Sequence, residues 1–595
     1  MPNSPKLTVM QVFSATAQKH GSKPALKVKR GGSWQTTTWA EYESQTRQAA
    51  KALIFLGLPH QQGISILGFN SPEWAVADMA AIYAGGFPAG IYTTNSPPQC
   101  KYIAEHSDSH VAFVENQEQL AKFLEIRPEL PLLKAIVLMN PGEDHDDKDV
   151  YSWKDFLALA ENITDEQLQE RFDAQDPDDI ATFIYTSGTT GNPKAVMITH
   201  DNITWTARRA MQVINDYQSV PEERVISYLP FSHIAEQVIS MHFPMVDGGC
   251  TYFAESIEKL GDNLREVRPT LFLAVPRVWE KIQAKIIMGA SKNTGLKKKI
   301  GAWAKGVGFE AGYASQDGKA PGLSYKIADK LVFSKVKALL GLDACRVQIT
   351  SAAPISKDTL EFFLSLGLPI MEVYGMSECT GPATLSLPTK YRTGSVGWGF
   401  EGAEVKIAPD GEICMRGRHV AKGYYKNPEA TAEAVDADGW LHSGDLGKLE
   451  GDLLYITGRK KEIIITAGGE NIAPNVIEGL MKGIPGVSQV VVVGDARKHL
   501  SALFTLDEEK LDIVRNETGC QGSMAELADN ETVKKWLMDR VNEKNSELAR
   551  VQTIKKVKIL SEDLSIDNGL MTPTMKVKRK VVNERYAAEI DAFYA

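Results

Sequence analysis

The chain has 595 residues, of which 43% are hydrophobic and 24% are charged, and its net charge is −9. This composition predicts a globular protein of several domain-sized units and excludes a disordered chain. A mildly acidic chain lacks the basic field of a nucleic-acid-binding protein, so we expect no nucleic-acid partner.

Cysteine usage and the N-terminal residues bear on the compartment. Six cysteines are scattered without a CxxC pair, which argues against a zinc site or a disulfide framework and fits a reducing compartment. The first residues lack the pattern of a signal peptide, and the longest apolar run, residues 79–92, contains two glycines and a proline. We therefore expect a cytoplasmic protein, with peripheral contact to a membrane surface as the remaining option.

Short β-branched runs alternate with helical patterns in the first two thirds of the chain. Three of them are predicted strands, at residues 63–68, 111–114 and 134–138. Strands that alternate with helices predict layered α/β architecture. The acidic stretch 144–179 has the pattern of a surface connection with a short helix, and it leads into a predicted strand at 181–185.

A polar loop follows that strand and carries the strongest chemical signal. It consists of Thr186, Ser187, Gly188, Thr189, Thr190, Gly191, Asn192, Pro193 and Lys194. Small residues let backbone N–H groups approach phosphate oxygens closely, and the hydroxyls and one ammonium group add donors. This inventory predicts a polyphosphate site. The alternative is a flexible polar hairpin.

The loop does not have the Walker pattern. No glycine directly precedes Lys194, no Ser or Thr follows it, and a strand at 195–199 comes next instead of a helix. We expect Asp201 or Asn202 to cap a helix that begins near Ile203.

Residues 281–340 are rich in Lys, Gly and Ala with helical spacing. Ile300, Trp303, Ala304 and Val307 fall on one helix face. The favoured interpretation is a pair of surface helices that pack an apolar stripe against the core. The alternative is a basic amphipathic surface that docks on lipid.

Taken together, these segments resemble the adenylate-forming (AMP-binding) superfamily, and the resemblance covers nearly the whole chain. The polar loop resembles the superfamily's phosphate loop, with Ala195 where a glycine is usual. The resemblance implies an α/β fold. A large N-terminal domain of layered α/β subdomains (1–458) would be followed by a small mobile α+β C-terminal domain (459–595), which includes a predicted strand at 487–493.

The resemblance also implies a nucleotide site. Tyr374 would stack on adenine, Ser377 would contact the α-phosphate, and Glu378 with Thr186 would hold Mg²⁺, because a hard cation prefers oxygen ligands. His233 matches a position near the acyl carboxylate, although a lone histidine is more often structural. The segments that would surround the nucleotide are Ser351, Ala352, Ala353 and Pro354, then Glu372, Val373, Tyr374, Gly375, Met376, Ser377 and Glu378.

Further motifs lie towards the C-terminus. By resemblance, Asp445 would bind the ribose hydroxyls, Arg459 would reach ribose or phosphate, and Lys461 would be the hinge. Gly468 and Gly469 would meet the pantetheine arm of CoA. The catalytic lysine would be Lys576, which follows Met575 where a glycine is usual, and Lys578 is a weaker candidate. An ammonium at this place stabilises the charge that builds up during attack on phosphorus.

The branch of the superfamily is indicated by residues 268–282, 68–74 and 90–97, which resemble long-chain fatty acyl-CoA synthetases of the bubblegum type. The implied activity is ATP-dependent formation of acyl-AMP and then of a thioester with CoA. Catalysis would rest on Lys576, Glu378, Lys194 and His233, and the substrates would be fatty acid, ATP with Mg²⁺, and CoA.

Two alternatives remain. One is an adenylate-forming enzyme that acts on a shorter or aryl acid or loads a carrier protein, although no carrier segment is recognised. The other is a catalytically silent binding protein, against which the intact Lys194, Glu378, Asp445, Arg459 and Lys576 argue.

Overall fold

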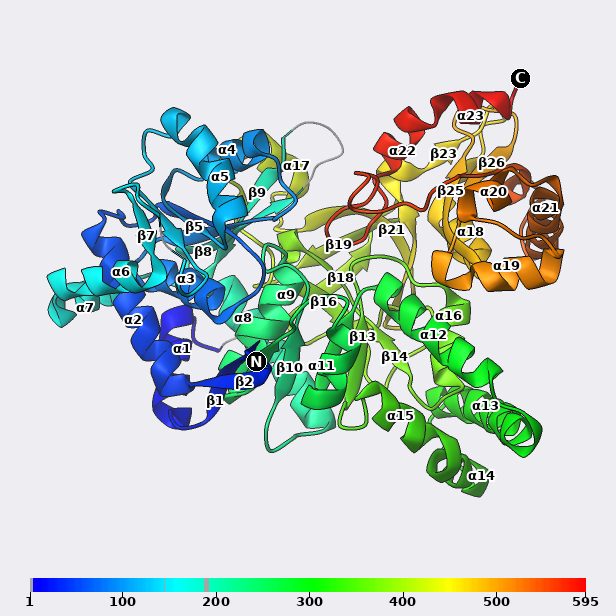
Figure 1. Ribbon diagram of the computed structural model, residues 1–595, viewed down its shortest axis with the longest axis horizontal. Coiled ribbons are helices and arrows are strands. Elements are labelled where there is room, and N and C mark those ends of the chain that lie inside the picture. Colours follow the sequence, from blue (N-terminus) through cyan, green and yellow to red (C-terminus); the bar gives the residue numbers. More distant parts are fainter. Residues whose placement is uncertain (1–3, 144, 187–191) are drawn as a thin grey trace.

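The computed structural model describes residues 4–143, 145–186 and 192–595. Figure 1 shows a large body of sheets and helices, and beside it the C-terminal region, residues 459–595, coloured from yellow through orange to red. The large body is layered α/β, and the C-terminal region combines helices with a small mixed sheet, as the sequence predicts. None of the described helices is long and apolar enough to cross a membrane.

Within the described residues, the largest sheet has eight strands. In spatial order they are β20 (Gly423–Tyr424), β9 (Lys194–Thr199), β8 (Ile180–Thr186), β4 (Phe87–Ile91), β3 (Gly63–Leu67), β5 (Ser109–Val114), β6 (Ala135–Leu138) and β7 (Val150–Ser152). The strands from β8 to β7 run parallel, while β9 is antiparallel to β8. The strands predicted near 63, 111, 134 and 181 are therefore confirmed.

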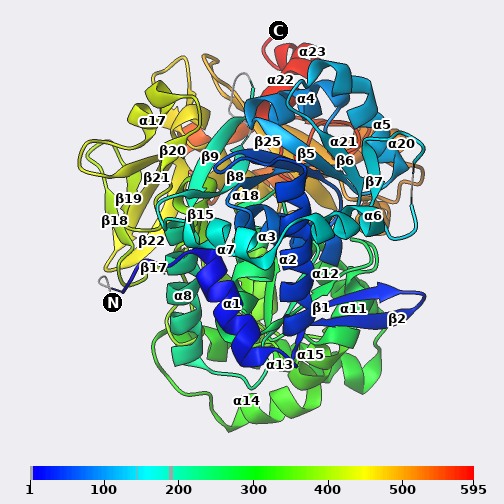
Figure 2. The same cartoon turned by 90° about the vertical axis from the view of Figure 1, so that its left-hand side faces the viewer.

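Helices cover both faces of this sheet (Figure 2). On β5, Val111 and Phe113 belong to the core beneath α1 (Val9–His20), α2 (Trp39–Phe55) and α3 (Pro72–Tyr83). Ala112 and Val114 belong to the core beneath α4 (Pro97–His106) and α5 (Gln117–Ile126). Successive side chains of a strand point to opposite faces, so a strand buried on both faces is apolar throughout.

The stretch 144–179 is more regular than the predicted surface connection. It supplies the edge strand β7, then α6 (Trp153–Ala158) and α7 (Asp165–Asp173). Phe156 and Leu168 are fully buried in the core with α2. Trp153, Leu157 and Phe172 pack partly buried against the same core, so apolar side chains hold this acidic stretch on the sheet.

The strands that flank the polar loop form an antiparallel pair, in which Thr186 lies opposite Lys194 and Tyr185 opposite Ala195. Ala195 is accommodated in extended backbone. The predicted phosphate-binding residues Ser187, Gly188, Thr189, Thr190 and Gly191 lie outside the described residues. Helix α8 (His200–Tyr217) is capped by Thr199 in a capping box with Asn202. The predicted cap at Asp201 or Asn202 is wrong, because the Thr199 hydroxyl accepts the backbone N–H that a helix start leaves unpaired.

Smaller sheets complete the large body. They are β10 (Arg224–Ser227), β11 (Cys250–Phe253), β1 (Pro24–Arg30) and β2 (Ser33–Thr38); β12 (Leu271–Ala274), β13 (Val347–Thr350) and β14 (Ile370–Glu372); β15 (Tyr374–Met376), β16 (Gly381–Leu385) and β17 (Trp398–Gly399); and β18 (Glu404–Ile407), β19 (Glu412–Arg416), β21 (Leu441–Glu450) and β22 (Leu453–Arg459). The ends of these strands carry most of the side chains of the site described below.

The C-terminal region has cores of its own. Its main sheet consists of β25 (Val487–Val493), β26 (Leu500–Leu506) and β27 (Ile554–Ile559), which confirms the strand predicted at 487–493. The helices around it are α18 (Pro474–Met481), α19 (Leu511–Thr518), α20 (Met524–Asp529), α21 (Glu531–Asn545), α22 (Arg579–Arg585) and α23 (Ala587–Ala592).

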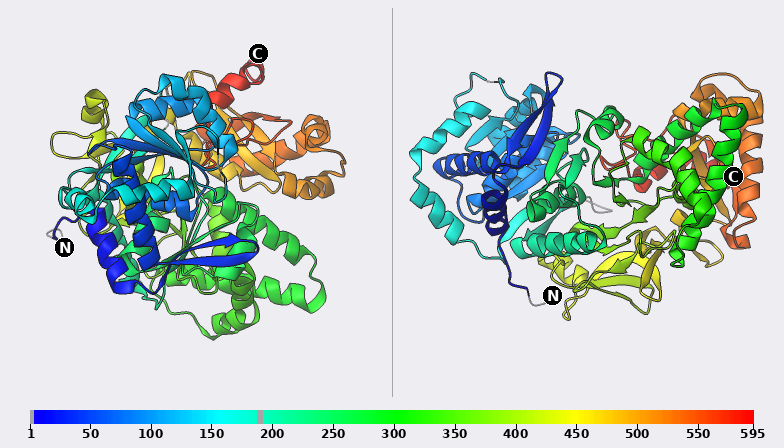
Figure 3. Two further views of the ribbon diagram at one scale, coloured as in Figure 1. Left: turned by 60° about the vertical axis from the view of Figure 1, so that its left-hand side comes forward. Right: turned by 90° about the horizontal axis from the view of Figure 1, so that it is seen from below.

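Residues 276–340 form helices that project from the large body (Figures 1 and 3). They are α12 (Pro276–Ser291), α13 (Gly295–Gln316), α14 (Leu323–Ala328) and α15 (Ser334–Leu340). Ala304 is buried in a small cluster with Ala328 and Phe333. The predicted buried stripe is wrong at Trp303, which is 42% exposed, because the helices bury only the narrow face around Ala304.

Candidate active site

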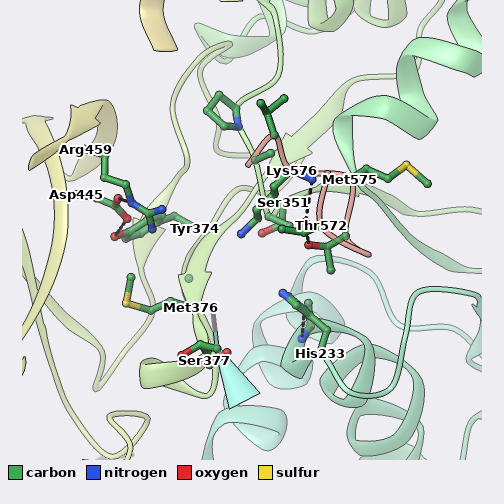
Figure 4. Close-up of a pocket in the computed structure, with 18 of the residues that line it drawn as sticks. His233, Ser351, Tyr374, Met376, Ser377, Asp445, Arg459, Thr572, Met575 and Lys576 are labelled. Carbon is green, nitrogen blue, oxygen red and sulfur yellow. Dashed lines mark hydrogen bonds and ion pairs between the residues drawn. The ribbon is translucent and has the colours of Figure 1, made fainter. Parts of the chain in front are cut away.

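A cavity of about 2710 Å³ lies between the large body and the C-terminal region. Figure 4 shows its polar part, where Lys576 and Thr572 of the C-terminal region approach residues from the ends of the smaller sheets. His233 lies on the facing side of the cavity from Lys576. The cavity therefore takes groups from both parts of the chain.

Lys576 is presented by a tight turn. The backbone N–H of Thr572 donates to the Lys576 carbonyl at 2.8 Å, and the Lys576 N–H donates to the Thr572 hydroxyl at 3.0 Å. Met575 has φ of 60°, the left-handed backbone that favours glycine. This conformation explains why a glycine is common before the lysine in the family pattern, and it aims the lysine into the cavity.

The charge of Lys576 is tuned by its surroundings. Burial lowers the pKa of its ammonium group, and the Arg459 guanidinium lowers it further. Asp445, Glu378 and Glu462 act in the opposite direction. Among the described carboxylates, none forms an ion pair with this ammonium group. Lys576 is therefore a cation that is held near acidic groups and remains available to a ligand.

Asp445 on β21 is held by two donors. The Tyr374 hydroxyl donates to one carboxylate oxygen at 2.9 Å, and Arg459 Nε donates to the other at 2.9 Å. The neighbouring Gly444 N–H donates to Glu412 at 2.8 Å, and His442 Nδ1 lies 3.1 Å from the same carboxylate. This network fixes the backbone turn that carries Asp445.

Glu378 and Lys194 meet at Tyr424. The Tyr424 hydroxyl donates to Glu378 Oε1 at 2.8 Å, and Lys194 Nζ lies 4.8 Å from the centre of the Tyr424 ring. Burial raises the pKa of the Tyr424 hydroxyl, so this group remains a donor. Tyr424 thus orients one carboxylate oxygen of Glu378 and lies close to the Lys194 ammonium group.

A slot of small residues lies beside Tyr374. The Ser351 hydroxyl donates to the Val373 carbonyl at 2.9 Å, and Ala352 has φ of 75°. A bulky side chain in this backbone would be strained and would also fill the slot. Glu372 borders it, accepts the Gly394 N–H at 2.8 Å, and has its pKa raised to about 8 by burial.

His233 caps helix α9 (Ile234–Gln237), and its Nδ1 accepts the Ala235 N–H at 3.2 Å. An accepting Nδ1 places the proton of the neutral ring on Nε2. Burial and then Lys576 lower the pKa of His233 to about 3, so the ring is neutral at physiological pH. His233 can donate one hydrogen bond from Nε2 but cannot act as a base with a pKa near 7.

Comparison with known proteins identifies the family. The family described as AMP-binding enzyme matches residues 13–425, and the family described as AMP-binding enzyme C-terminal domain matches residues 461–595. The chain belongs to the AMP-binding enzyme family.

Among curated members of this family, the long-chain-fatty-acid–CoA ligase ACSBG2 of Xenopus laevis is 45% identical over 99% of this chain and 84% of its own length. Human ACSBG2 is 42% identical over 99% of this chain and 92% of its own length. Human ACSBG1 is 39% identical over 100% and 86%. These identities confirm the resemblance to the bubblegum-type branch.

Solved AMP-binding structures share the fold. The anthranilate CoA ligase AuaEII in complex with anthranoyl-AMP has a TM-score of 0.75 at 19% identity, with 99% of each chain covered. The A domain of the carboxylic acid reductase from Segniliparus rugosus has a TM-score of 0.75 at 21% identity and covers 100% of this chain and 95% of its own. At this identity the likeness concerns the fold alone.

The cavity brings together nearly all described residues that the sequence nominated for this AMP-binding enzyme. They are Thr186, Asn192, Pro193, Lys194, His233, the segments 351–354 and 372–378, Asp445, Arg459, Lys461 and Lys576. Lys578 also borders it. Gly468 and Gly469 are exposed and do not line the cavity. Their place on the CoA path stays a prediction.

Sequence reasoning gave no role to several residues that organise the site. Tyr424 joins Glu378 to Lys194 because β20 pairs with β9, a contact between distant segments. Glu412 and His442 lie on paired strands and order the turn before Asp445. The Gly-Tyr-Tyr run at 423–425 and the histidine just before Asp445 were the available signals.

Proposed function

We propose that this protein is an ATP-dependent, AMP-forming long-chain-fatty-acid–CoA ligase. The observation that carries the proposal is Lys576, an ammonium from the C-terminal region that enters the same cavity as Glu378, Asp445 and Lys194. The names of the relatives, which are 38–45% identical over nearly the whole chain, support the same activity.

A long acyl chain is supported by the apolar part of the cavity. It is lined by Ala210 and Ile214 of α8, Val238 and Ile239 of the π-helix η3 (Val238–His242), Phe243 of α10 (Phe243–Asp247), and Leu385 of β16. Apolar walls joined to a polar end suit a ligand with a hydrocarbon tail and a carboxylate head. We propose this branch as the acyl site.

In the first half-reaction, a carboxylate oxygen of the fatty acid attacks the α-phosphorus of ATP. A new P–O bond forms, and the bond to the bridging oxygen of pyrophosphate breaks. The Lys576 ammonium stabilises the negative charge that develops on the phosphoryl and carboxyl oxygens, and Lys194 stabilises the leaving pyrophosphate. His233 donates its Nε2 proton as a hydrogen bond that orients the carboxylate.

The nucleotide is held by the residues around the slot. Tyr374 and the small residues 351–353 flank the adenine, and Asp445 accepts hydrogen bonds from the ribose hydroxyls in exchange for its present partners. The site fits Mg²⁺ because Glu378 presents an oriented carboxylate oxygen in the cavity that Thr186 also lines. When bound, Mg²⁺ neutralises phosphate charge.

In the second half-reaction, the thiolate sulfur of CoA attacks the acyl carbonyl carbon. The bond between that carbon and the AMP oxygen breaks, and the thiol proton passes to solvent. Gly468 and Gly469 lie outside the cavity here, so we propose that a mobile C-terminal domain (459–595) turns about Lys461 relative to the N-terminal domain (1–458). One hinge then serves both half-reactions.

The test uses purified protein with ATP, Mg²⁺, CoA and acids from acetate to very long fatty acids. We expect AMP release that requires CoA and is fastest with long chains. Pyrophosphate exchange without acyl-CoA would favour a carrier-loading enzyme, and a preference for short or aryl acids would favour that class of ligase. ATP binding without turnover would leave a silent binding protein.

We also propose a cytoplasmic protein that contacts membranes peripherally through α12–α15. Residues 281–340 contain twelve lysines against three acidic residues, so they carry a charge of +9 in a chain of −9. Nine of the sixteen large hydrophobic side chains exposed in the described structure lie between residues 287 and 339, among them Leu296 at 71% and Leu323 at 74%. Exposed apolar groups among an excess of lysines match an anionic bilayer surface.

This surface is tested by flotation with vesicles of phosphatidylcholine, with or without phosphatidylserine. We expect binding that requires the anionic lipid and is lost in the L296S/L323S/L339S variant. The F55S variant, which changes an exposed apolar residue elsewhere, serves as the matched control and should bind normally. Equal flotation of all three proteins would contradict the assigned surface.

A further inference from the structure

An arginine at the start of α12 joins the large body to the C-terminal region. The Arg277 guanidinium lies 3.6 Å from Glu280 on its own helix, 3.4 Å from Asp507 and 3.3 Å from Asp563. We call these four residues the Arg277 cluster. Asp507 follows β26 and Asp563 follows β27, so two of the three carboxylates belong to the C-terminal region. Figure 1 shows α12 next to that region.

The position of Arg277 is unfavourable within its own helix. A cation in the first turn opposes the helix macrodipole, and this turn contains no acidic residue. The side chain is nevertheless only 15% exposed, and Asp507 is 6% exposed. Glu280, one turn further along the helix, compensates this charge in part, and two carboxylates from the C-terminal region add to it. Screening by salt is weak for charges removed from water in this way.

Each side of the contact also has partners that do not depend on the other side. Asp563 accepts hydroxyl hydrogen bonds from Ser488 and Thr505, both at 2.6 Å. Asp507 lies 3.2 Å from Lys510, and Arg277 retains Glu280. Separation of the two parts therefore leaves no buried charge without a partner. An unpartnered buried charge is the usual large penalty for breaking a buried ion pair, and it does not arise here. The cluster can form and break repeatedly.

The cluster lies at the base of the segment that carries Lys576. From Asp563 the chain runs through Leu564, Leu570 and Met571, which pack in one core with strands β25 and β26. The turn with Lys576 follows directly. Met575 packs against this core and also against the core of the large body. A contact at Asp563 is therefore transmitted to Lys576 through packed side chains.

We infer that Arg277 is a positioning residue for adenylation, which holds the C-terminal region in the orientation that places Lys576 in the cavity. The inference rests on the proposed function. Arg277 touches no residue of the nucleotide site that we describe, so it acts through Lys576. The thioester-forming step needs the C-terminal region in another orientation and does not use the cluster.

The test measures the two half-reactions separately in the full-length protein. Adenylation is followed by acid-dependent pyrophosphate release, and thioester formation by AMP release from supplied acyl-adenylate and CoA. We expect R277M to lower kcat of adenylation roughly tenfold to a hundredfold, with KM for ATP and acid little changed. Thioester formation should stay within about twofold of the wild type. R277K, which keeps the charge, should recover part of the loss.

Two controls separate positioning from a general structural role. R265M removes an exposed arginine that pairs with Asp262 inside α11 (Leu260–Val267), and it should leave both half-reactions unchanged. The D507N substitution should slow adenylation, and in the R277M/D507N double variant the two losses should not add, because the residues act through each other.

The inference is overturned if R277M slows both half-reactions equally, if it leaves adenylation at the wild-type rate, or if the losses in the double variant add. Failure of the proposed function is a different result, since the wild-type protein itself would then release no AMP.

Discussion

At the scale of single residues, the chemistry of the cavity depends on which side chains carry charge. Lys576 and Lys194 supply positive charge, whereas His233 is neutral and donates from Nε2. Glu378 and Asp445 are each oriented by a tyrosine hydroxyl. The site thus holds its charged groups in place before substrate arrives, which is how polar sites stabilise a developing charge.

Removal of the Lys576 ammonium should separate the half-reactions. We expect K576A to slow adenylation about a hundredfold or more, because the developing charge loses its stabilising cation. Thioester formation from supplied acyl-adenylate should persist. The matched control is K578A, which removes an exposed lysine at the edge of the same cavity and should retain adenylation. If K578A lost adenylation and K576A retained it, Lys578 would be the catalytic lysine.

The lowered pKa of Lys576 predicts an alkaline limit for adenylation. The protonated amine is the active form, and burial with Arg459 brings its pKa below the ordinary value of 10.5. As pH rises through that lowered pKa the charge is lost, so adenylation should fall at a pH below 10.5. The rate of thioester formation from supplied acyl-adenylate, measured over the same pH range, should not show this alkaline fall. A fall in both half-reactions at the same pH would show that another group is titrating.

At the scale of elements, the cavity is built from strand ends and tight turns. The sequence patterns located the strands near 63, 111, 134 and 181, because alternating or continuous apolar runs are local signals. The motifs near 351, 374 and 445 were located by their resemblance to the family. The cap of α8 was mispredicted, and residues 145–179 contain the predicted helical structure but are more regular than a surface connection. The outcome depends on a specific hydroxyl contact in the first case and on buried apolar side chains in the second.

The turn before Lys576 predicts an unusual order of stability. Met575 adopts a positive φ, in which alanine is strained by about 1 kcal/mol and glycine is not. Both M575A and M575G lose the same packing. We therefore expect M575G to be the more stable of the two by about 1 kcal/mol, measured as the free energy of unfolding of the C-terminal region. A more stable M575A would contradict the backbone conformation.

The π-helix η3 predicts acyl-chain selectivity. Ile239 is buried and lines the apolar branch of the cavity. An indole at this position would shorten the apolar branch. The I239W variant should therefore lose activity with long acids by about tenfold or more and retain activity with short acids. This loss corresponds to the roughly 1–3 kcal/mol by which a hydrophobic pocket discriminates between substrates. The ratio of the two rates within the variant is independent of its folded fraction. An unchanged ratio would place the acyl chain elsewhere.

At the scale of the whole molecule, two parts with separate cores meet at one cavity. The Arg277 cluster and Met575 both make contacts across this interface. Lys461 lies exposed at the cavity edge, in the short helix η6 (Lys460–Glu462) that follows β22. Ion pairs contribute to the interface, as expected for parts that move against each other.

Restriction of the hinge should affect the second half-reaction more than the first. Proline fixes φ, so K461P limits the backbone rotation that the turning of the C-terminal region requires. We expect thioester formation from supplied acyl-adenylate to slow by tenfold or more while adenylation stays near the wild-type rate. K461A, which removes the side chain but keeps the backbone free, is the control and should perform both steps. Equal loss in the two variants would move the hinge elsewhere.

The sequence by itself determined the family, the order of the motifs and the identity of most cavity residues. Motif residues that carry hydroxyls, carboxylates and ammonium groups can be recognised from their order and spacing in the chain. Only the tertiary structure decided which neighbours tune them. Tyr424 donates to Glu378, Arg459 pairs with Asp445 and lowers the pKa of Lys576, and Arg277 pairs with Asp507 and Asp563. Such contacts depend on how layers pack and how the two parts of the chain are oriented, and neither has a local signature in the chain.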